Sequence, residues 1–179
     1  MSFDACFDAT LGIEGGYVDD PSDSGGATKY GITERVARAH GYRGDMRALS
    51  EAEARQIARS QYWDTLSLDV IDALSSAIAR EMFDTGYNMG VGTVGGFLQR
   101  ALNVFNHRGQ DYPDMVVDGL IGPMTIAALR VYLGKRGKPG EVVLLRALND
   151  LQGQRYISLA EARQKDEDYV YGWILNRVA

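Results

Sequence analysis

The sequence contains few of the residues that build metal centres and disulfide frameworks. Among its 179 residues there is one cysteine, Cys6, and there are two histidines, His40 and His107. A single cysteine forms no disulfide within the chain, and zinc sites of the usual composition need more ligands than these. We therefore expect no metal and no other cofactor. The residues also argue against an endopeptidase, because the metal-ligand and nucleophile sets that such chemistry uses are missing.

The sequence also lacks a long apolar run and an excess of positive charge. No stretch approaches the roughly 20 apolar residues of a membrane-spanning helix. Residues 1–5 contain neither a basic segment nor a continuous apolar one, so we expect no secretory signal and synthesis in the cytoplasm. The net charge of −5 argues against nucleic acid as a ligand, because such binding relies on neutralising phosphates.

Length and composition predict a folded protein with a sizeable core. An apolar content of 45% and a charged content of 24% are ordinary for a globular chain. At this length we expect one domain, or one domain with a small lobe, and a monomer.

The first apolar pattern of the chain ends at a carboxylate. Residues 2–13 predict a short amphipathic helix whose apolar face carries Phe3, Cys6, Phe7, Thr10 and Leu11. Glu14 follows on the same face, where the charged form of a carboxyl group is disfavoured and its pKa rises. Gly15-Gly16 then ends the helix and leaves space beside the carboxyl. This is the arrangement that a general acid needs.

Glu14 has a second interpretation, as a partly exposed residue in the last turn or one satisfied by backbone N–H groups. The residues that follow are rich in Gly, Asp and Ser, so they predict turns and a short β-hairpin at about 16–33.

The stretch from Glu14 to Thr33 resembles a family signature. Its matching residues are Glu14-Gly15-Gly16-Tyr17, Asp20-Pro21, Asp23, Gly25-Gly26, Thr28 and Tyr30-Gly31-Ile32-Thr33. It is similar to the signature of glycoside hydrolase family 108, N-acetylmuramidases of the phage-endolysin and secretion-activating type. The resemblance implies a lysozyme-like fold, peptidoglycan as substrate, and action in the periplasm and cell wall after release through a holin-like pore. It also implies that Glu14 is the catalytic acid, because the family's proposed acid is the glutamate of this motif.

Asp23 is the first candidate for a second catalytic group. Lysozymes of the T4 phage type are similar in running from a helix-ending Glu, through an Asp nine residues on, to a Thr before a Gly-Ile turn. Here Asp23 is nine residues after Glu14, and Thr28 is one residue short of the T4-type spacing. Such a carboxylate activates water or stabilises the oxocarbenium-like centre. Asp20 and Asp19 are further candidates for the second carboxylate, and Thr28 is a candidate to position the water or the sugar. Turn chemistry also explains the aspartates, and a hairpin strand also explains Thr28.

Aromatic residues supply candidates for sugar binding, because sugars stack on flat rings. Tyr62 and Trp63 stand together at the end of a predicted helix, and core packing explains them equally well. Tyr30 in the signature and Tyr87 near a second candidate stretch complete this set.

The second stretch is Phe83-Asp84 followed by Asn88-Met89-Gly90, which resembles a family stretch that ends a central helix and faces the cleft. The resemblance makes Asn88 a candidate to bind an N-acetyl group or the attacking water, and Asp84 an alternative second carboxylate. A helix C-cap explains Asn88 as well, and we favour a structural role for Asp84.

Helical patterns and caps predict most of the remaining chain. Thr33 is expected to cap a short helix that ends near Gly41, and Ser50 with Glu53 forms a capping box that opens a helix through about Trp63. One buried helix is expected from about residue 69 and runs out over 84–92. Another is expected over about 93–106, and a long one over about 141–164 after a basic break at 135–140. A last amphipathic helix is expected near Trp173.

Residues 118–125, Asp-Gly-Leu-Ile-Gly-Pro-Met-Thr, resemble a turn of small peptidoglycan-binding modules. The family's C-terminal part is a predicted peptidoglycan domain, so the resemblance implies wall binding. A tight turn at Asp118-Gly119 and a helix start at Pro123 explain the same residues without a ligand.

The sequence thus predicts a mainly α, lysozyme-like fold, a helical bundle whose small β-hairpin flanks an active-site cleft. Residues 1–92 form the muramidase part and 93–179 the predicted peptidoglycan-binding part, packed as one globular unit. We expect hydrolysis of the β-1,4 bond between N-acetylmuramic acid and N-acetylglucosamine. The alternative is a non-catalytic wall-binding or secretion-accessory protein on the same scaffold.

Overall fold

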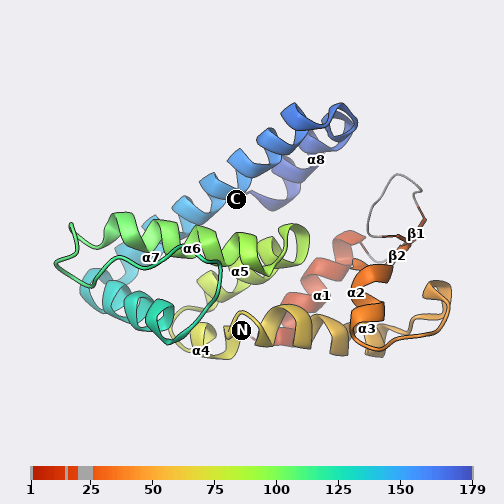
Figure 1. Cartoon of the computed structure of the whole chain (residues 1–179), viewed down its shortest axis with the longest axis horizontal. Coiled ribbons are helices and arrows are strands. Elements are labelled where there is room, and N and C mark those ends of the chain that lie inside the picture. Colours follow the sequence, from red (N-terminus) through yellow and green to blue (C-terminus); the bar gives the residue numbers. More distant parts are fainter. Residues whose placement is uncertain (1, 15, 20–25, 179) are drawn as a thin grey trace. The chain divides into compact units, whose positions relative to one another are not determined.

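A computed structural model describes residues 2–14, 16–19 and 26–178 (Figure 1), and for residues 11–14 only the backbone. The chain forms two compact units, Met1–Thr65 and Leu66–Ala179, and each is described by itself. The predicted division into residues 1–92 and 93–179 stays a prediction.

The first unit combines short helices with one small sheet. Its elements are the helices α1 (Phe3–Glu14), α2 (Glu34–Ala39) and α3 (Glu51–Ala58), the strands β1 (Tyr17–Val18), β2 (Thr28–Lys29) and β3 (Ile32–Thr33), the 3₁₀ helix η1 (Met46–Ala48) and the π-helical turn η2 (Arg59–Asp64). The strands are antiparallel in the order β1-β2-β3. The predicted hairpin is therefore present, with a third short strand added.

Helix caps in the first unit follow the sequence closely. The side chain of Thr33 accepts a hydrogen bond from the backbone N–H of Val36, so α2 begins where predicted. Ser50 and Glu53 form the expected capping box at the start of α3. The helix does not continue regularly to Trp63, because residues 59–64 form the wider π-helical turn.

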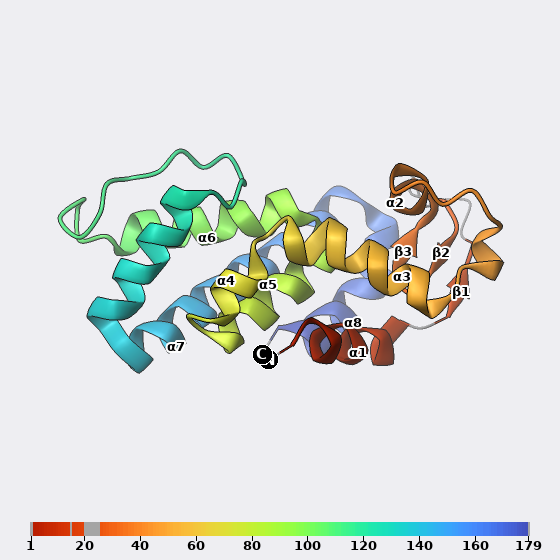
Figure 2. The same cartoon turned by 90° about the horizontal axis from the view of Figure 1, so that it is seen from below.

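The second unit is helical. It contains α4 (Leu68–Asp72), α5 (Ser76–Met89), α6 (Val91–Phe105), α7 (Pro123–Ala162), the 3₁₀ helix η3 (Gln164–Asp166) and α8 (Glu167–Arg177), which Figure 2 shows from below. The prediction of one continuous helix from residue 69 is wrong. The chain breaks after Asp72, and buried Ser75 caps the new helix α5 by accepting a hydrogen bond from the N–H of Ile78 at 3.2 Å.

Helix α7 contains the predicted basic break as a kink rather than an open loop. Gly137 has φ 56° and ψ −148° inside it, a conformation that favours glycine. After the kink, Leu144 and Leu148 are buried, whereas Val143 and Ile157 are exposed. The buried face of this part of α7 is therefore narrower than the distribution of its apolar residues along the sequence would predict.

The mainly α fold class with a small antiparallel sheet is confirmed. None of the helices that the structure describes has both the length and the apolar character needed to span a bilayer.

Candidate functional site

Helix α1 carries the candidate acid at its end. Its buried face consists of Phe3, Cys6, Phe7 and Thr10, which confirms these four positions of the predicted stripe. Thr10 adds a hydrogen bond from its hydroxyl to the carbonyl oxygen of Cys6 at 3.0 Å. Glu14 is the last helical residue, one turn after Thr10. Its side chain lies outside the described part of the chain, as does that of Leu11.

Two arginines, one on α3 and one on η2, contact side chains of α1. Arg55 on α3 donates to Asp4 and Asp8 of α1 at 3.0 and 2.7 Å, and its guanidinium lies 4.7 Å from the ring centroid of Phe7. One helical turn later, Arg59 lies over the ring of Phe3 at 5.4 Å. The hydrogen-bonded carboxylates raise the pKa of Arg55, so it stays charged throughout the working range. These contacts fix the helix that ends at Glu14.

The sheet begins close to the end of α1. Only Gly15 and Gly16 separate Glu14 from β1, and Val18 of β1 is paired with Thr28 of β2. Four residues span at most about 14 Å, so the backbone at Glu14 stays within reach of the strand that carries Thr28. The fold therefore holds the candidate acid and this candidate positioning residue in one unit.

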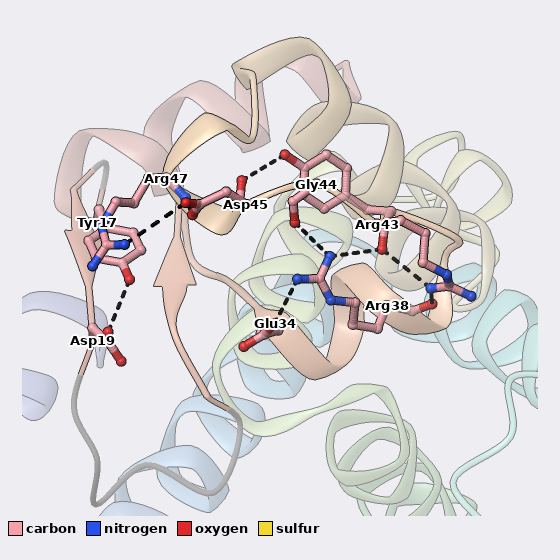
Figure 3. A network of polar contacts seen from close by, with 9 residues as sticks. Tyr17, Asp19, Glu34, Arg38, Arg43, Gly44, Asp45 and Arg47 are labelled. Carbon is pink, nitrogen blue, oxygen red and sulfur yellow. Dashed lines mark hydrogen bonds and ion pairs between the residues drawn. The ribbon is translucent and has the colours of Figure 1, made fainter.

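Polar contacts hold the sheet against η1 (Figure 3). The hydroxyl of Tyr17 donates to Asp19 at 3.1 Å, and the guanidinium of Arg47 lies 4.9 Å from the centroid of the Tyr17 ring. Arg47 also lies 3.9 Å from the carboxylate of Asp45, and its carbonyl oxygen accepts a hydrogen bond from Lys29 at 2.6 Å. Both strands that flank the segment containing Asp23 are thereby attached to η1.

The same network continues into α2 (Figure 3). Arg38 donates to Glu34 at 2.7 Å and to the carbonyl oxygens of Tyr42 and Gly44 at 3.1 and 2.7 Å. Arg43 donates to the carbonyl oxygen of Arg38 at 2.8 Å. Hydrogen bonds from the side chains of Arg38 and Arg43 to backbone carbonyl oxygens thus hold the loop between α2 and η1 in place.

The candidate residues around the sheet are partly described. Asp20 and Asp23 lie outside the described residues. Asp19 is exposed and accepts the Tyr17 hydrogen bond, while Thr28 is half-buried with its hydroxyl 3.5 Å from the carbonyl oxygen of Gly26. Tyr30 is half-buried with a φ of 54°, and the ammonium of Lys29 lies 5.1 Å from its ring centroid.

Tyr62 and Trp63 belong to the core. Trp63 is 1% exposed and meets Phe3 edge-on with ring centroids 5.6 Å apart. Tyr62 is 6% exposed, and burial raises the pKa of its hydroxyl to about 12. This burial favours the core-packing interpretation over stacking on a sugar.

The second candidate stretch lies inside α5 rather than after it. The helix continues to Met89, and Gly90 with φ 90° is its C-cap, so Asn88 is not the capping residue. The amide of half-buried Asn88 donates to the carbonyl oxygen of Asp84 at 2.8 Å, and Tyr87 is 7% exposed with its ring 5.6 Å from that of Phe83. The sequence predicts that the helical pattern runs out over residues 84–92, and the helix ends within that range.

Asp84 takes part in a buried ion pair of the second unit. Arg177 of α8 donates to it at 2.9 Å, and Gln152 of α7 lies 3.4 Å from its other oxygen. Burial raises the pKa of Asp84 even though Arg177 opposes that shift. The contacts join α5, α7 and α8, which supports the structural role.

Glu81, one turn before Thr85 on α5, is a titratable residue that sequence reasoning missed. Burial raises its pKa to about 7, and the Thr85 hydroxyl donates to its carboxylate at 2.9 Å. The carboxyl group can therefore hold or release a proton near neutral pH. Glu81 lies three positions after buried Ile78, so the helical spacing places it at the edge of the buried face, but an acidic residue at such an edge is ordinarily read as exposed.

The turn at Asp118-Gly119 is attached to α6. Buried Gln99 donates to Asp118 at 2.8 Å and accepts from the N–H of Gly119 at 2.8 Å. A Cβ atom added to Gly95 would lie 2.1 Å from the carbonyl oxygen of Gly119, so the two backbones approach as closely as glycine allows. These contacts give the motif a structural role that needs no ligand.

Within the described residues, no group of three or more His, Cys, Asp or Glu side chains could hold a metal ion.

Comparison with known proteins identifies two segments. Residues 7–90 match the family model described as glycosyl hydrolase 108, and residues 96–178 match the model described as a predicted peptidoglycan domain. No curated protein matches the chain. Among solved structures it is similar to SagA from Brucella abortus, with 23% identity over 98% of this chain and 95% of that chain and a TM-score of 0.66, a likeness that supports the fold. The chain thus carries a glycosyl hydrolase 108 domain at residues 7–90 and a predicted peptidoglycan domain at residues 96–178, and together they support a peptidoglycan hydrolase.

Proposed function

We propose that this chain is an N-acetylmuramidase that cleaves the β-1,4 bond between N-acetylmuramic acid and N-acetylglucosamine, with Glu14 as its general acid. The observation that carries the proposal is the glycosyl hydrolase 108 match over residues 7–90, which contains the Glu14-Gly15-Gly16-Tyr17 motif. The position of Glu14 at the end of a well-anchored helix, beside two glycines, supports it.

The proposed reaction divides the work between two carboxyl groups. Glu14 protonates the leaving glycosidic oxygen, and Asp23 activates water or stabilises the developing positive charge on the sugar. Asp20 and Asp19 are the alternatives to Asp23, and Thr28 positions the water or the sugar. Tyr30 on the sheet remains a proposed contact to the substrate. Cleavage takes place in the cell wall, which the enzyme reaches through a holin-type pore.

The test compares the parent chain with Glu14→Gln on purified peptidoglycan. Fragments are reduced with borohydride and identified by mass spectrometry, so that the sugar at each new reducing end is read directly. We expect muramitol ends from the parent, and a rate lowered by about 10²–10⁴ in Glu14→Gln, the usual contribution of a general acid.

Asp23→Asn and Asp19→Asn form a matched pair for the second group, since both remove one charge within the same segment. A comparable loss in Asp23→Asn alone is expected. New ends on N-acetylglucosamine would keep the hydrolase but change the bond. If both the parent and Glu14→Gln sediment with the wall and release nothing, the muramidase proposal is wrong and a non-catalytic wall-binding role replaces it.

A further inference from the structure

A hollow of about 340 Å³ opens in the second unit between α6 and the part of α7 that follows its kink. These two helices pack against each other (Figures 1 and 2). The apolar lining includes Phe97 from α6 and Leu151 from α7. Arg100 and Arg155 contribute one guanidinium from each helix. The volume is at the small end of the range for small-molecule sites.

Neither arginine is neutralised by the residues that the structure describes. Arg100 and Arg155 are both exposed, and neither forms an ion pair or hydrogen bond with a described residue. On a helix, the residues three and four positions away are the ones that can pair with a charge. None of these positions around either arginine holds an acidic residue. Two unpaired positive charges therefore flank the hollow of a chain whose net charge is −5.

The lining matches a small anion with an apolar part. A guanidinium binds a carboxylate through two parallel hydrogen bonds, and Ser158 and Gln154 add hydrogen-bonding groups to the wall. Phe97 and Leu151 form the apolar floor of the hollow, which a methyl group can contact. A short acidic peptide containing alanine has both the carboxylate and the methyl group.

We propose that this hollow binds a carboxylate-bearing end of the peptidoglycan stem peptide. The proposal rests on the proposed function, because it takes peptidoglycan as the substrate. It assigns recognition of the peptide to the second unit, whereas the glycan is cleaved by the residues around Glu14. A phosphate-containing wall polymer presents similar negative charge, but it lacks a methyl group next to the charge for the apolar floor.

The experiment measures binding of the disaccharide–tetrapeptide that muramidase cleavage would leave, which no longer contains the bond to be cut. Calorimetric titration of the full chain gives Kd for this probe, for the same probe with its carboxylates amidated, for the disaccharide without peptide, and for inorganic phosphate. Arg100→Gln and Arg155→Gln are compared with Arg146→Gln, an exposed arginine of α7 that does not line the hollow. Thermal unfolding of each variant confirms that it is folded.

We expect each variant of a lining arginine to weaken binding of the tetrapeptide probe about tenfold, the lower range for a charge-assisted hydrogen bond at an exposed site. Arg146→Gln should bind as the parent does, and amidation should weaken parent binding to the level of the variants. The proposal is overturned if the disaccharide without peptide binds equally well, if amidation has no effect, or if inorganic phosphate binds more tightly than the peptide probe.

The two proposals can fail separately. A parent chain that cleaves peptidoglycan but shows no arginine-dependent binding keeps its function and loses this site. A chain that binds the probe through Arg100 and Arg155 but releases no muramyl ends keeps the site and loses the proposed reaction.

Discussion

The guanidinium of Arg55 lies 2.7 Å from the carboxylate of Asp8, which joins α3 to the helix that ends at Glu14. The same guanidinium lies 3.0 Å from Asp4 and 2.8 Å from Glu51, and it covers the ring of Phe7. Single exposed ion pairs contribute little, but three carboxylates on one partly buried guanidinium form a network. The position of the candidate acid therefore depends on a residue 41 positions later in the sequence.

Replacing Arg55 with Met should destabilise the first unit by about 1–2 kcal/mol, because the methionine keeps an apolar cover on Phe7 but removes all three ion pairs. Urea unfolding at low and at high salt measures the effect. The difference from the parent should shrink at high salt, since exposed charges are screened. Arg35→Met on α2 is the control, an exposed arginine without an ion pair to a described residue, and it should change stability by less than about 0.5 kcal/mol. Equal effects of the two substitutions would contradict the network.

Close backbone contact predicts a strong effect at Gly95. A Cβ atom there would lie 2.1 Å from the carbonyl oxygen of Gly119, and one at Gly119 would lie 2.4 Å from that of Gly92. Gly95→Ala should therefore lower the free energy of unfolding of the second unit by at least about 3 kcal/mol, because backbone atoms must shift to accept the methyl group.

Gly134→Ala is the matched control for this substitution. Gly134 lies in α7 with open space around its Cβ position, so alanine should stabilise the helix by up to about 1 kcal/mol. Thermal denaturation followed by circular dichroism compares the two variants. A Gly95→Ala protein that melts with the parent would show that the turn at Gly119 does not approach α6 this closely.

Local signals predicted the elements that are set by local interactions. Thr33, the capping box of Ser50 with Glu53, and Pro123 at the start of α7 all act within one helical turn, so the sequence contains the whole cause. The break before Ser75 was missed because the apolar pattern continues across it while one buried serine caps the next helix.

The candidate site was predictable in its chemistry and less so in its surroundings. The motif that begins at Glu14 identifies a family, but the contacts of Arg55 with Asp4 and Asp8 join residues about 50 positions apart and leave no local pattern. Trp63 was ambiguous because an aromatic ring suits both a sugar and a core. The burial of Trp63 is decided by its packing on Phe3, which the sequence does not show.

The ion pair of Asp84 with Arg177 predicts a stability role that can be separated from catalysis. Asp84→Asn keeps the shape of the side chain but removes the charge opposite Arg177, whose side chain is 3% exposed. We expect the free energy of unfolding, measured in urea, to fall by about 2 kcal/mol. This is less than the 3–5 kcal/mol for deleting a partner outright, because the amide oxygen still accepts a hydrogen bond.

Hydrolysis measured well below the melting temperature should stay within about threefold of the parent. Asp150→Asn on the exposed side of α7 controls for the charge. A folded Asp84→Asn protein without hydrolysis would make Asp84 a catalytic carboxylate instead.

The pKa of Glu81, raised by burial to about 7 from an ordinary value of 4.5, predicts how stability depends on pH. Between these two values the folded chain binds more protons than the unfolded chain, so stability falls as the pH rises through this window. The loss approaches on the order of 3 kcal/mol above pH 7, where folding must bury the ionised carboxylate.

Glu81→Gln removes this titration while its amide oxygen can still accept the hydrogen bond from Thr85. Urea unfolding of parent and variant across the window should therefore give a stability difference that changes in favour of the variant by on the order of 3 kcal/mol as the pH rises from about 4.5 to about 7. Asp84 is present in both proteins, but its repulsion with the Glu81 carboxylate, which helps to raise the pKa of Glu81, is lost in the variant and belongs to this difference. Glu161→Gln, an exposed residue of α7, should run parallel to the parent. A difference between parent and Glu81→Gln that stays constant with pH would mean that Glu81 titrates at its ordinary value, and that the second unit does not bury its carboxyl group.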